Sequence, residues 1–478
     1  MWIQKSVKDR LLNRASPIPT QVVSNEEYYP MPQTQDQKRV EWHVNQLADH
    51  YAPKLGLSRR QFLKTTGGMA VAFMALNEVF GSHFKVSAAE ATEAEAYSEL
   101  WPKNQFIFDV QTHHVRTEGV GPLFFRKISE AFNKELEGIE HKPSDIKLKN
   151  YTKEIFFDSD TTIGLISGVS SLILNTLTVD EMVNTRNTLN ELAGSQRMLS
   201  HGFFAPYFPD PISEMERQVK ELKIDAWKCY TGVQERGGEF PWTMDDEEQV
   251  YPLYDKALEL GVKNICVHKG LPLPHSNVEY THPRDIKKAA LDYPDLNYII
   301  YHSGFKAANY ELPPTADEYI GEDGYLAWTT DLVRDRLETP SMTNVYMELG
   351  TSFGHTVITH PKLTGHLLGQ IINAFGSDHV IWGTDSIWWG SPQWQIEAFR
   401  RFQISDELQE RFGYAPITEE DRAKIFGLNA ARVFNVDVDA VRNAFPDDGL
   451  SRLKAEYIYE GADPSNTQYG WIKDDSRT

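Results

Sequence analysis

The stretch Phe106–His114 (FIFDVQTHH) contains the residues of this chain best suited to hold a metal ion. It begins as an apolar run and ends in polar side chains. If the run is a β-strand, alternate residues share a face, so Asp109, Gln111 and His113 point to the same side. The usual form of such a metal-binding strand has two histidines two positions apart. Here the first of those positions is Gln111.

Residues of similar chemistry occur at the ends of later apolar runs. These are Lys228, His268, His302, Glu348 and Asp385. Zn²⁺ is typically held by neutral imidazoles and a carboxylate, with one position open for water or substrate. His113, His268 and Asp385 could provide that set, and Gln111 could be a weak extra ligand.

The remaining polar and aromatic residues suggest the other parts of a catalytic site. His302 could be a ligand of a second metal site or, without metal, could polarise a substrate oxygen. Asp385 could also take a proton from metal-bound water, whose pKa falls on the metal. Trp388 and Trp389 could form an apolar wall for a flat substrate, and Lys228 and Glu348 are expected in or near the pocket.

Eight short apolar runs alternate with amphipathic stretches and indicate the elements that carry these residues. The expected strands are 106–110, 162–167, 198–204, 226–230, 264–268, 298–302, 345–349 and 379–383. The expected helices between them include 179–194, 213–222, 250–261, 283–293 and 362–375. Alternating strands and helices predict a parallel sheet, and eight repeats favour a closed (β/α)₈ TIM barrel. An open doubly wound sheet is the alternative, but no glycine-rich phosphate loop follows the first strand. In a barrel, the carboxyl ends of the strands meet at one pocket.

Two segments are longer than a plain barrel requires. Residues 116–160 follow the first strand and contain an amphipathic helical pattern, so we expect a lid or a subunit contact there. Residues 271–282 form another expected rim loop. His275, His282, His355 and His360 are expected in solvent-facing rim loops. The tail 441–478 is expected to pack on the barrel exterior.

Charge and cysteine content exclude some classes of protein. The formal net charge of −20 argues against a nucleic-acid partner. The two cysteines, Cys229 and Cys266, lie in apolar runs and are expected to be buried free thiols.

The first 89 residues contain a possible export signal. Ser58–Lys64 (SRRQFLK) resembles a twin-arginine signal, and the apolar run 67–76 and the small residues 86–89 follow it. The run is too short for a permanent membrane anchor. We therefore expect residues 1–89 to be an N-terminal extension and signal peptide outside the fold, and residues 90–440 to be the barrel. The expected location is periplasmic or extracellular, with the twin-arginine export machinery as a partner.

From Phe106 to Val436 the chain resembles the amidohydrolase-related family, in its amidohydrolase 2 branch. The motifs that carry the resemblance are FDVQTH, VYPLYDKALELGVKNICVH, YIIYHSG, TNVYMELG, VIWGTDS and IFGLNAARVFNV. The resemblance implies a TIM barrel with one divalent metal, Zn²⁺ or else Mn²⁺. It implies metal roles for His113, His268 and Asp385, and a catalytic role for His302. It also places Gln111 where the first ligand should be.

Three functions follow as hypotheses. The first is a metal-dependent hydrolase of a small organic ester, lactone or amide. The second is a metal-dependent decarboxylase of an aromatic or unsaturated acid. The third is a non-catalytic binding barrel whose metal site has degenerated at Gln111. In each case the partner is a small molecule, and a homo-oligomer is possible, as in many family members.

Overall fold

The structure of this protein is a computed structural model. The structure describes residues 2–11, 16–21, 23, 32–116, 146–170, 176–232, 234–235, 238–239, 241–272, 276–307, 312–313, 315–388, 390–464 and 470–473. Its main sheet has eight parallel strands in the order β11-β10-β9-β8-β5-β4-β3-β2. Their bounds are β2 Phe108–Thr112, β3 Ile163–Ile166, β4 Met198–Phe203, β5 Ala226–Tyr230, β8 Asn264–His268, β9 Asn297–Tyr301, β10 Val345–Glu348 and β11 Val380–Ile381.

Backbone hydrogen bonds join the first and last strands of this sheet. Val110 N–H donates to Trp382 O at 3.1 Å, and Asp385 N–H donates to Gln111 O at 2.9 Å. Thr112 and Ser386 form a parallel bridge just beyond. The sheet therefore closes into the predicted TIM barrel, and the seam lies between Gln111 and Asp385.

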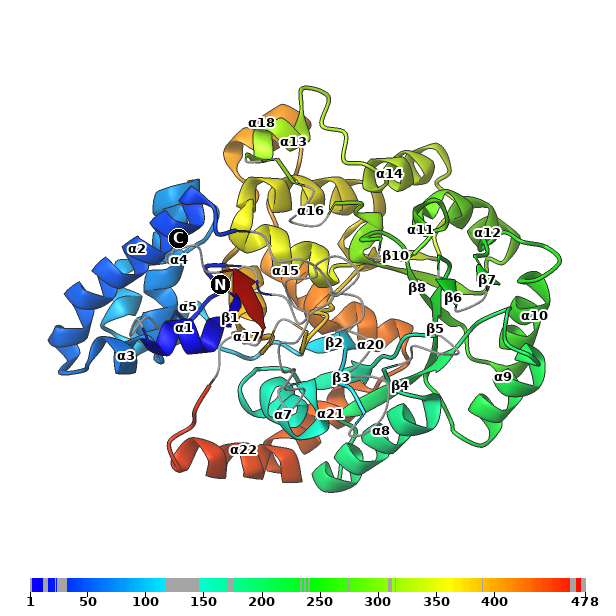
Figure 1. Ribbon diagram of the computed structural model, residues 1–478, viewed down its shortest axis with the longest axis horizontal. Coiled ribbons are helices and arrows are strands. Elements are labelled where there is room, and N and C mark those ends of the chain that lie inside the picture. Colours follow the sequence, from blue (N-terminus) through cyan, green and yellow to red (C-terminus); the bar gives the residue numbers. More distant parts are fainter. Residues whose placement is uncertain are drawn as a thin grey trace.

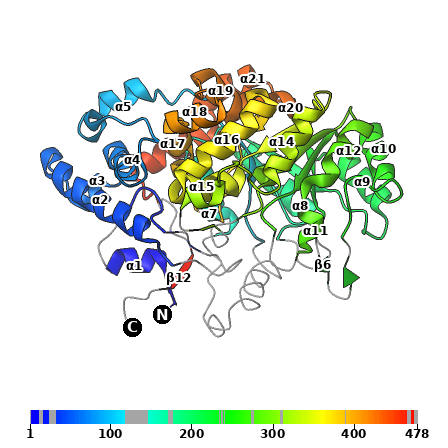
Figure 2. The same ribbon diagram turned by 90° about the horizontal axis from the view of Figure 1, so that it is seen from above.

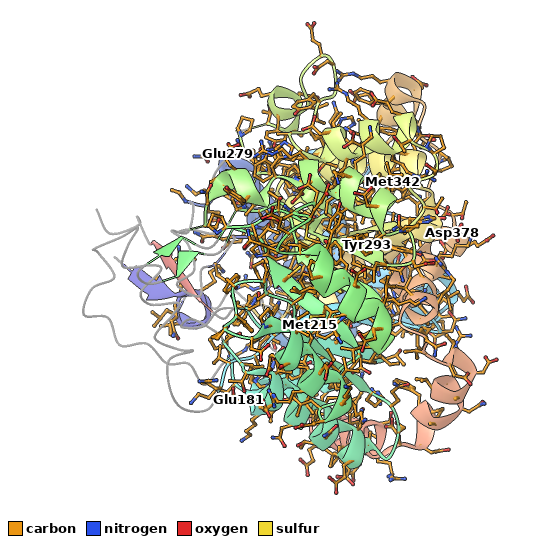
Figure 3. The ribbon with its side chains drawn as sticks, turned by 90° about the vertical axis from the view of Figure 1, so that its right-hand side faces the viewer. Glu181, Met215, Glu279, Tyr293, Met342 and Asp378 are labelled. Carbon is orange, nitrogen blue, oxygen red and sulfur yellow. The ribbon has the colours of Figure 1, made fainter. Side chains whose placement is uncertain are left out.

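Helices cover the outside of the barrel (Figure 1). The main ones are α8 Val179–Ala193, α9 Pro211–Lys220, α10 Tyr251–Leu260, α12 Ile286–Asp292, α14 Thr329–Glu338, α15 Gly350–Thr359, α16 Pro361–Phe375, α17 Gln393–Arg401 and α20 Asn429–Val433. Figure 3 turns this layer to the viewer, with Glu181 on α8 and Met215 on α9. Gly194 and Gly261 end α8 and α10 in the left-handed conformation, which glycine adopts without strain.

Shorter elements lie in the connections and at the periphery. They are α1 Lys5–Leu11, α3 Arg59–Phe62, α7 Leu148–Thr152, α11 Val278–Thr281, α13 Ala316–Ile320, α18 Asp406–Phe412, α19 Glu419–Ala423, α21 Val438–Ala444, α22 Gly449–Tyr459 and the hairpin β6 Gln234–Glu235 with β7 Gly238–Glu239. The motif IFGLNAARVFNV, residues 425–436, lies in a π-helical turn, Lys424–Leu428, that continues as α20.

The N-terminal segment differs from expectation, because its described part is folded. Helices α2 (Gln35–Tyr51) and α4 (Thr66–Phe80) pack together and lie beside α17, with α5 (Ala94–Leu100) next to them (Figures 1 and 2). Most of α4 is buried. A side chain at Gly68 would meet the carbonyl oxygen of Phe62 at 2.5 Å, so the close packing needs glycine there.

A buried ion pair fastens this segment to the barrel. Arg401 Nη1 lies 2.8 Å from Glu90 Oε2, and both side chains are fully buried. The Arg401 guanidinium also lies over the rings of Phe73 and Trp101. Glu90 follows the expected signal segment, and within residues 1–89 the buried helix α4 packs on α2. Whether the segment is removed during export remains a prediction.

The two ends of the described chain also meet. Strand β1 (Trp2–Gln4) pairs antiparallel with β12 (Trp471–Lys473). Before β12, helix α22 lies against the barrel, where Asp448 forms a buried ion pair with Arg197 at 2.8 Å. Residues 117–145, most of the expected lid, lie outside the described residues. None of the described helices is long and apolar enough to cross a membrane.

Candidate active site

Five barrel strands bring the predicted site residues to one end of the barrel. Gln111 lies on β2, His268 ends β8, and Glu348 ends β10. His113 follows β2, His302 follows β9, and Asp385 follows β11. All six side chains are buried. Since parallel strands share one carboxyl end, the predicted convergence follows from the barrel itself.

His113 and Asp385 face each other across the seam. His113 Nε2 lies 2.9 Å from Asp385 Oδ1. The other ring nitrogen, Nδ1, lies 2.9 Å from the carbonyl oxygen of Ser167. A carbonyl only accepts, so Nδ1 carries a proton, and Nε2 is the ring nitrogen that faces the carboxylate. Two lone-pair donors this close are stabilised by a cation or a proton between them.

Asp385 is held by the turn that follows β11. Its backbone has a φ of +60°, and the Thr351 hydroxyl donates to its Oδ2. Asp109 fixes the same turn, because its Oδ1 accepts from the backbone N–H groups of Thr384 and Gln111 at 3.0 and 3.1 Å. Asp109 thus positions the turn, although its place on the strand suggested a residue facing the site.

His268 has the same arrangement as His113. Its Nε2 donates to the carbonyl oxygen of Leu271 at 3.1 Å, which leaves Nδ1 as a buried lone pair with no hydrogen-bond partner. The His268 ring lies 4.6 Å from that of His302 and stacks on Tyr230 at 4.9 Å. A histidine tied to a carbonyl through one nitrogen is preorganised to offer the other to a metal.

His302 is held by Glu348. The backbone N–H of His302 donates to Glu348 Oε2 at 2.9 Å, and the Ser303 hydroxyl donates to the Glu348 carbonyl at 2.7 Å. Both His302 and Ser303 have positive φ, a strained conformation common at functional sites. Glu348 therefore acts on the backbone of His302, and its Oε1 has no hydrogen-bond partner.

Gln111 presents its carbonyl oxygen to the site. Gln111 Oε1 is buried and has no hydrogen-bond partner. A Cβ atom at Gly350 would lie 2.7 Å from Gln111 Oε1 and 2.8 Å from His302 Nδ1. Gly350 thus leaves the space into which these two groups project, and a larger residue there would fill it.

Burial sets the protonation of the titratable groups. Burial lowers the pKa of His268 to about 4, with the nearby Lys228 charge adding to it. Burial also brings the pKa of His302 well below its ordinary value. Burial raises the pKa of Asp385, but the contact with His113 outweighs it and brings that pKa below its usual range. At neutral pH the His268 and His302 imidazoles are therefore neutral and the Asp385 carboxyl group is ionised.

These donors fit a divalent metal by type. The His113 Nε2, His268 Nδ1, Gln111 Oε1 and Asp385 Oδ1 atoms are all acceptors, and the first three are buried without a hydrogen-bond partner. No group of three or more His, Cys, Asp or Glu side chains among the described residues is arranged to hold an ion. Metal binding would therefore have to draw the His268 ring and the Asp385 carboxylate together.

Aromatic rings line the site beside two of the candidate ligands. Trp388 stacks on His113 at 5.1 Å, and Tyr230 stacks on His268. Trp389, the other predicted wall residue, lies outside the described residues. Lys228 points into the barrel interior, 3.5 Å from the centre of the Tyr301 ring.

The rim histidines and the cysteines can now be placed. His355 and His360 are buried in and beside α15, not in solvent-facing loops, because α15 packs between the barrel and α16. His282 caps the turn at Arg284, and His275 lies outside the described residues. Cys229 and Cys266 are buried free thiols, as expected.

The sequence prediction missed His201 and Tyr301. His201 on β4 is fully buried, and its Nε2 lies 3.4 Å from the Tyr301 hydroxyl. That hydroxyl donates to Val110 O at 2.6 Å. Both positions alternate with outward-facing residues of predicted strands, so strand periodicity could have shown that they face the interior.

Several solved structures resemble this one. An uncharacterised TIM-barrel protein from Bordetella bronchiseptica has 18% identity and a TM-score of 0.47, over 69% of this chain and 98% of that chain. A dihydroxybenzoic acid decarboxylase from Polaromonas, with bound manganese, has 17% identity and a TM-score of 0.40, over 70% and 97%. A probable 2-pyrone-4,6-dicarboxylic acid hydrolase from Acinetobacter baumannii, with citric acid bound, has 10% identity and a TM-score of 0.41, over 69% and 99%.

Comparison with curated proteins finds none that matches. The family model described as Amidohydrolase, of the amidohydrolase 2 type, matches residues 175–436. This match covers most of the barrel, including the strand ends with His268, His302 and Asp385. Because it spans more than half of the chain, this protein belongs to the amidohydrolase family.

Proposed function

We propose that this protein is a metal-dependent hydrolase of a small organic ester, lactone or amide. The observation that carries the proposal is the pair of histidines, His113 and His268, each tied to a backbone carbonyl through one ring nitrogen. The other nitrogen of His113 lies 2.9 Å from Asp385, and that of His268 is buried without a hydrogen-bond partner. This is how metal-binding histidines are oriented in proteins. We propose Zn²⁺ as the metal, with Mn²⁺ as the alternative.

A divalent metal held by these residues would act as a Lewis acid and lower the pKa of bound water. The chain itself supplies the rest. Asp385 remains ionised and, held by the Thr351 hydroxyl, receives a proton at Oδ2 or balances the charge of the ion. Neutral His302 stands beside His268 and can hydrogen-bond to an oxygen that becomes negative during the reaction. Burial excludes bulk water and strengthens both interactions.

Decarboxylation of an aromatic or unsaturated acid is the second candidate. It is favoured by Trp388 and Tyr230, whose rings stack on His113 and His268 and provide flat apolar surfaces beside the ligands. In this reaction the substrate, rather than water, would occupy the open position at the metal.

Metal analysis and a substrate panel test the proposal. The purified protein is expected to contain about one Zn²⁺ or Mn²⁺ per chain. It should hydrolyse one class among lactones, esters and amides of organic acids, and chelation should abolish this activity. Release of CO₂ from hydroxybenzoates without hydrolysis would replace the first candidate by the second. Absence of metal, with no response to added Zn²⁺ or Mn²⁺, would refute both.

A further inference from the structure

Two fully buried lysines of neighbouring strands differ in their surroundings. The ammonium group of Lys269 donates to the carbonyl oxygens of Tyr280 and His282 and to Asp285 Oδ2, at 2.8, 3.1 and 2.7 Å. Its three N–H groups therefore each have an acceptor, and its charge is balanced by a carboxylate. Lys269 is a structural lysine.

Lys228 has none of these acceptors. Its Nζ atom is buried without a hydrogen-bond partner, and no carboxylate of the described residues lies within 4 Å of it. What it does contact is aromatic, since Nζ lies 3.5 Å from the ring centre of Tyr301 and 5.0 Å from that of Tyr230. The face of an aromatic ring stabilises a cation. It does not replace the oxygen acceptors that the N–H groups of an ammonium need.

The position of Lys228 relates it to the candidate active site. On the sheet, Lys228 is paired with Cys266, and Tyr230 with His268, so its side chain starts one interior layer below the histidine. Its charge acts on His268 and His302, and the charge of Asp385 acts on it. The ammonium group therefore lies beneath the strand ends, within electrostatic reach of the residues that define the site.

A buried ammonium group without an acceptor is costly unless an anion reaches it. We infer that Lys228 is the anion-binding residue of the substrate site and donates hydrogen bonds to a carboxylate of the substrate. Nearby, Glu348 Oε2 is engaged with the His302 backbone, and the Tyr301 hydroxyl is engaged with Val110 O. No acceptor of the described residues bonds to Lys228 Nζ, and an acceptor brought by the ligand would fill this place. The inference rests on the proposed function, because it takes these strand ends to be the substrate site.

The test compares the binding of benzoate with that of benzamide, which has the same shape but no charge. Binding is measured by calorimetry and by the ligand-induced rise in Tm, in metal-loaded and chelator-treated protein, so that a carboxylate bound only to metal is recognised. Lys228→Met is expected to weaken benzoate binding about tenfold or more in both forms, since a hydrogen bond to a charged group is lost. Benzamide binding should not change, and Lys228→Arg should recover part of the benzoate affinity.

Lys269→Met is the matched control. It leaves Asp285 buried without its partner, so it should lower the Tm while the folded protein keeps its benzoate affinity. Lys228→Met should keep or raise the Tm, because no hydrogen bond is lost. Equal benzoate affinity in wild type and Lys228→Met would overturn the inference, as would equal loss of benzamide binding. If Lys228→Met does not fold, Lys228→Gln serves for the same comparison.

The two proposals fail separately. Turnover of a substrate with a KM unchanged in Lys228→Met would refute the role of Lys228 and leave the proposed function intact. Benzoate binding that depends on Lys228, in a protein that holds no metal and turns over no substrate of the panel, would support the anion site and refute the metal-dependent reaction.

Discussion

His113 Nε2 and Asp385 Oδ1 lie 2.9 Å apart at the seam where the barrel closes. The hydrogen bonds between β2 and the turn after β11 hold this pair, so the same backbone contacts complete the fold and assemble the candidate site. Ser167 holds the other side of the His113 ring. The pair is thus preorganised by strands far apart in sequence.

Asp385→Asn is expected to remove most of the metal. The amide keeps the shape of the side chain but loses the charge that balances the ion. Bound Zn²⁺ or Mn²⁺, measured by elemental analysis, should fall at least tenfold, and kcat/KM by roughly a hundredfold or more. Asp378→Asn, on the outer layer in Figure 3, is the control and should change neither. Full metal content in Asp385→Asn would show that Asp385 is not a ligand.

Gln111→Glu is expected to tighten metal binding. It replaces a neutral oxygen that has no hydrogen-bond partner with a carboxylate oxygen in the same place. Affinity for Mn²⁺, measured by competition with a chelator, should rise about tenfold. Gln403→Glu on the surface is the control. An unchanged affinity would contradict a ligand role for Gln111. Activity that appears only in Gln111→Glu would identify the natural protein as a binding barrel with a degenerate site.

The strands and most strand-end residues could be predicted from the sequence, because short apolar runs that end in His, Glu or Asp repeat through the chain. Strand β5 was predicted to the residue, and β2 only to within two residues, because a register shift between Asp109 and Thr112 lengthens its C-terminal end. The same shift explains why Asp109 contacts Thr384 rather than the site.

Other features depend on contacts that a sequence does not show. Lys228 and Lys269 both lie at the ends of predicted strands, yet only the fold brings Asp285 to one of them. Likewise, the apolar run 67–76 has the composition of a signal peptide. The fold uses it as a helix, packed against α2 and held through Glu90 and Arg401.

His83 is expected to make the protein less stable in mild acid. The side chain is buried near Phe402, and burial lowers its pKa to about 4. Between pH 6.5 and 4, the unfolded chain binds a proton that the folded chain does not, so stability is lost as the pH falls. The slope from one such group reaches about 1.4 kcal/mol per pH unit. His83→Phe should flatten the pH dependence of urea unfolding in this range, whereas His50→Gln, at an exposed position, should not. An unchanged slope in His83→Phe would contradict burial of this segment.

Glu90→Ala is expected to destabilise the protein by about 3 kcal/mol, because it leaves the buried Arg401 charge without its partner. Glu93→Ala, three residues later and exposed, should cost less than about 0.5 kcal/mol. Urea unfolding measures both. Similar small effects for the two variants would show that the N-terminal helices are not fastened to the barrel at Arg401.

Export through the twin-arginine pathway remains a prediction, and the packing of the motif sharpens its test. Ser58 caps helix α3, Phe62 and Leu63 are buried, and Arg59 lies 3.3 Å from Asp49. Changing Arg59 and Arg60 together to lysine should stop export, while the retained protein keeps the Tm of the wild type, since lysine can still pair with Asp49.

Cell fractionation measures export, and mass spectrometry of the exported chain locates its first residue. An exported chain that begins near Glu90 would have lost α4. We expect it to have a lower Tm than the full chain, because Arg401 loses Phe73 of α4 and Phe402 loses His83 and Phe84. An exported chain that still contains α4 would instead show that the motif remains part of the folded enzyme. Export that persists in the double-lysine variant would refute the pathway.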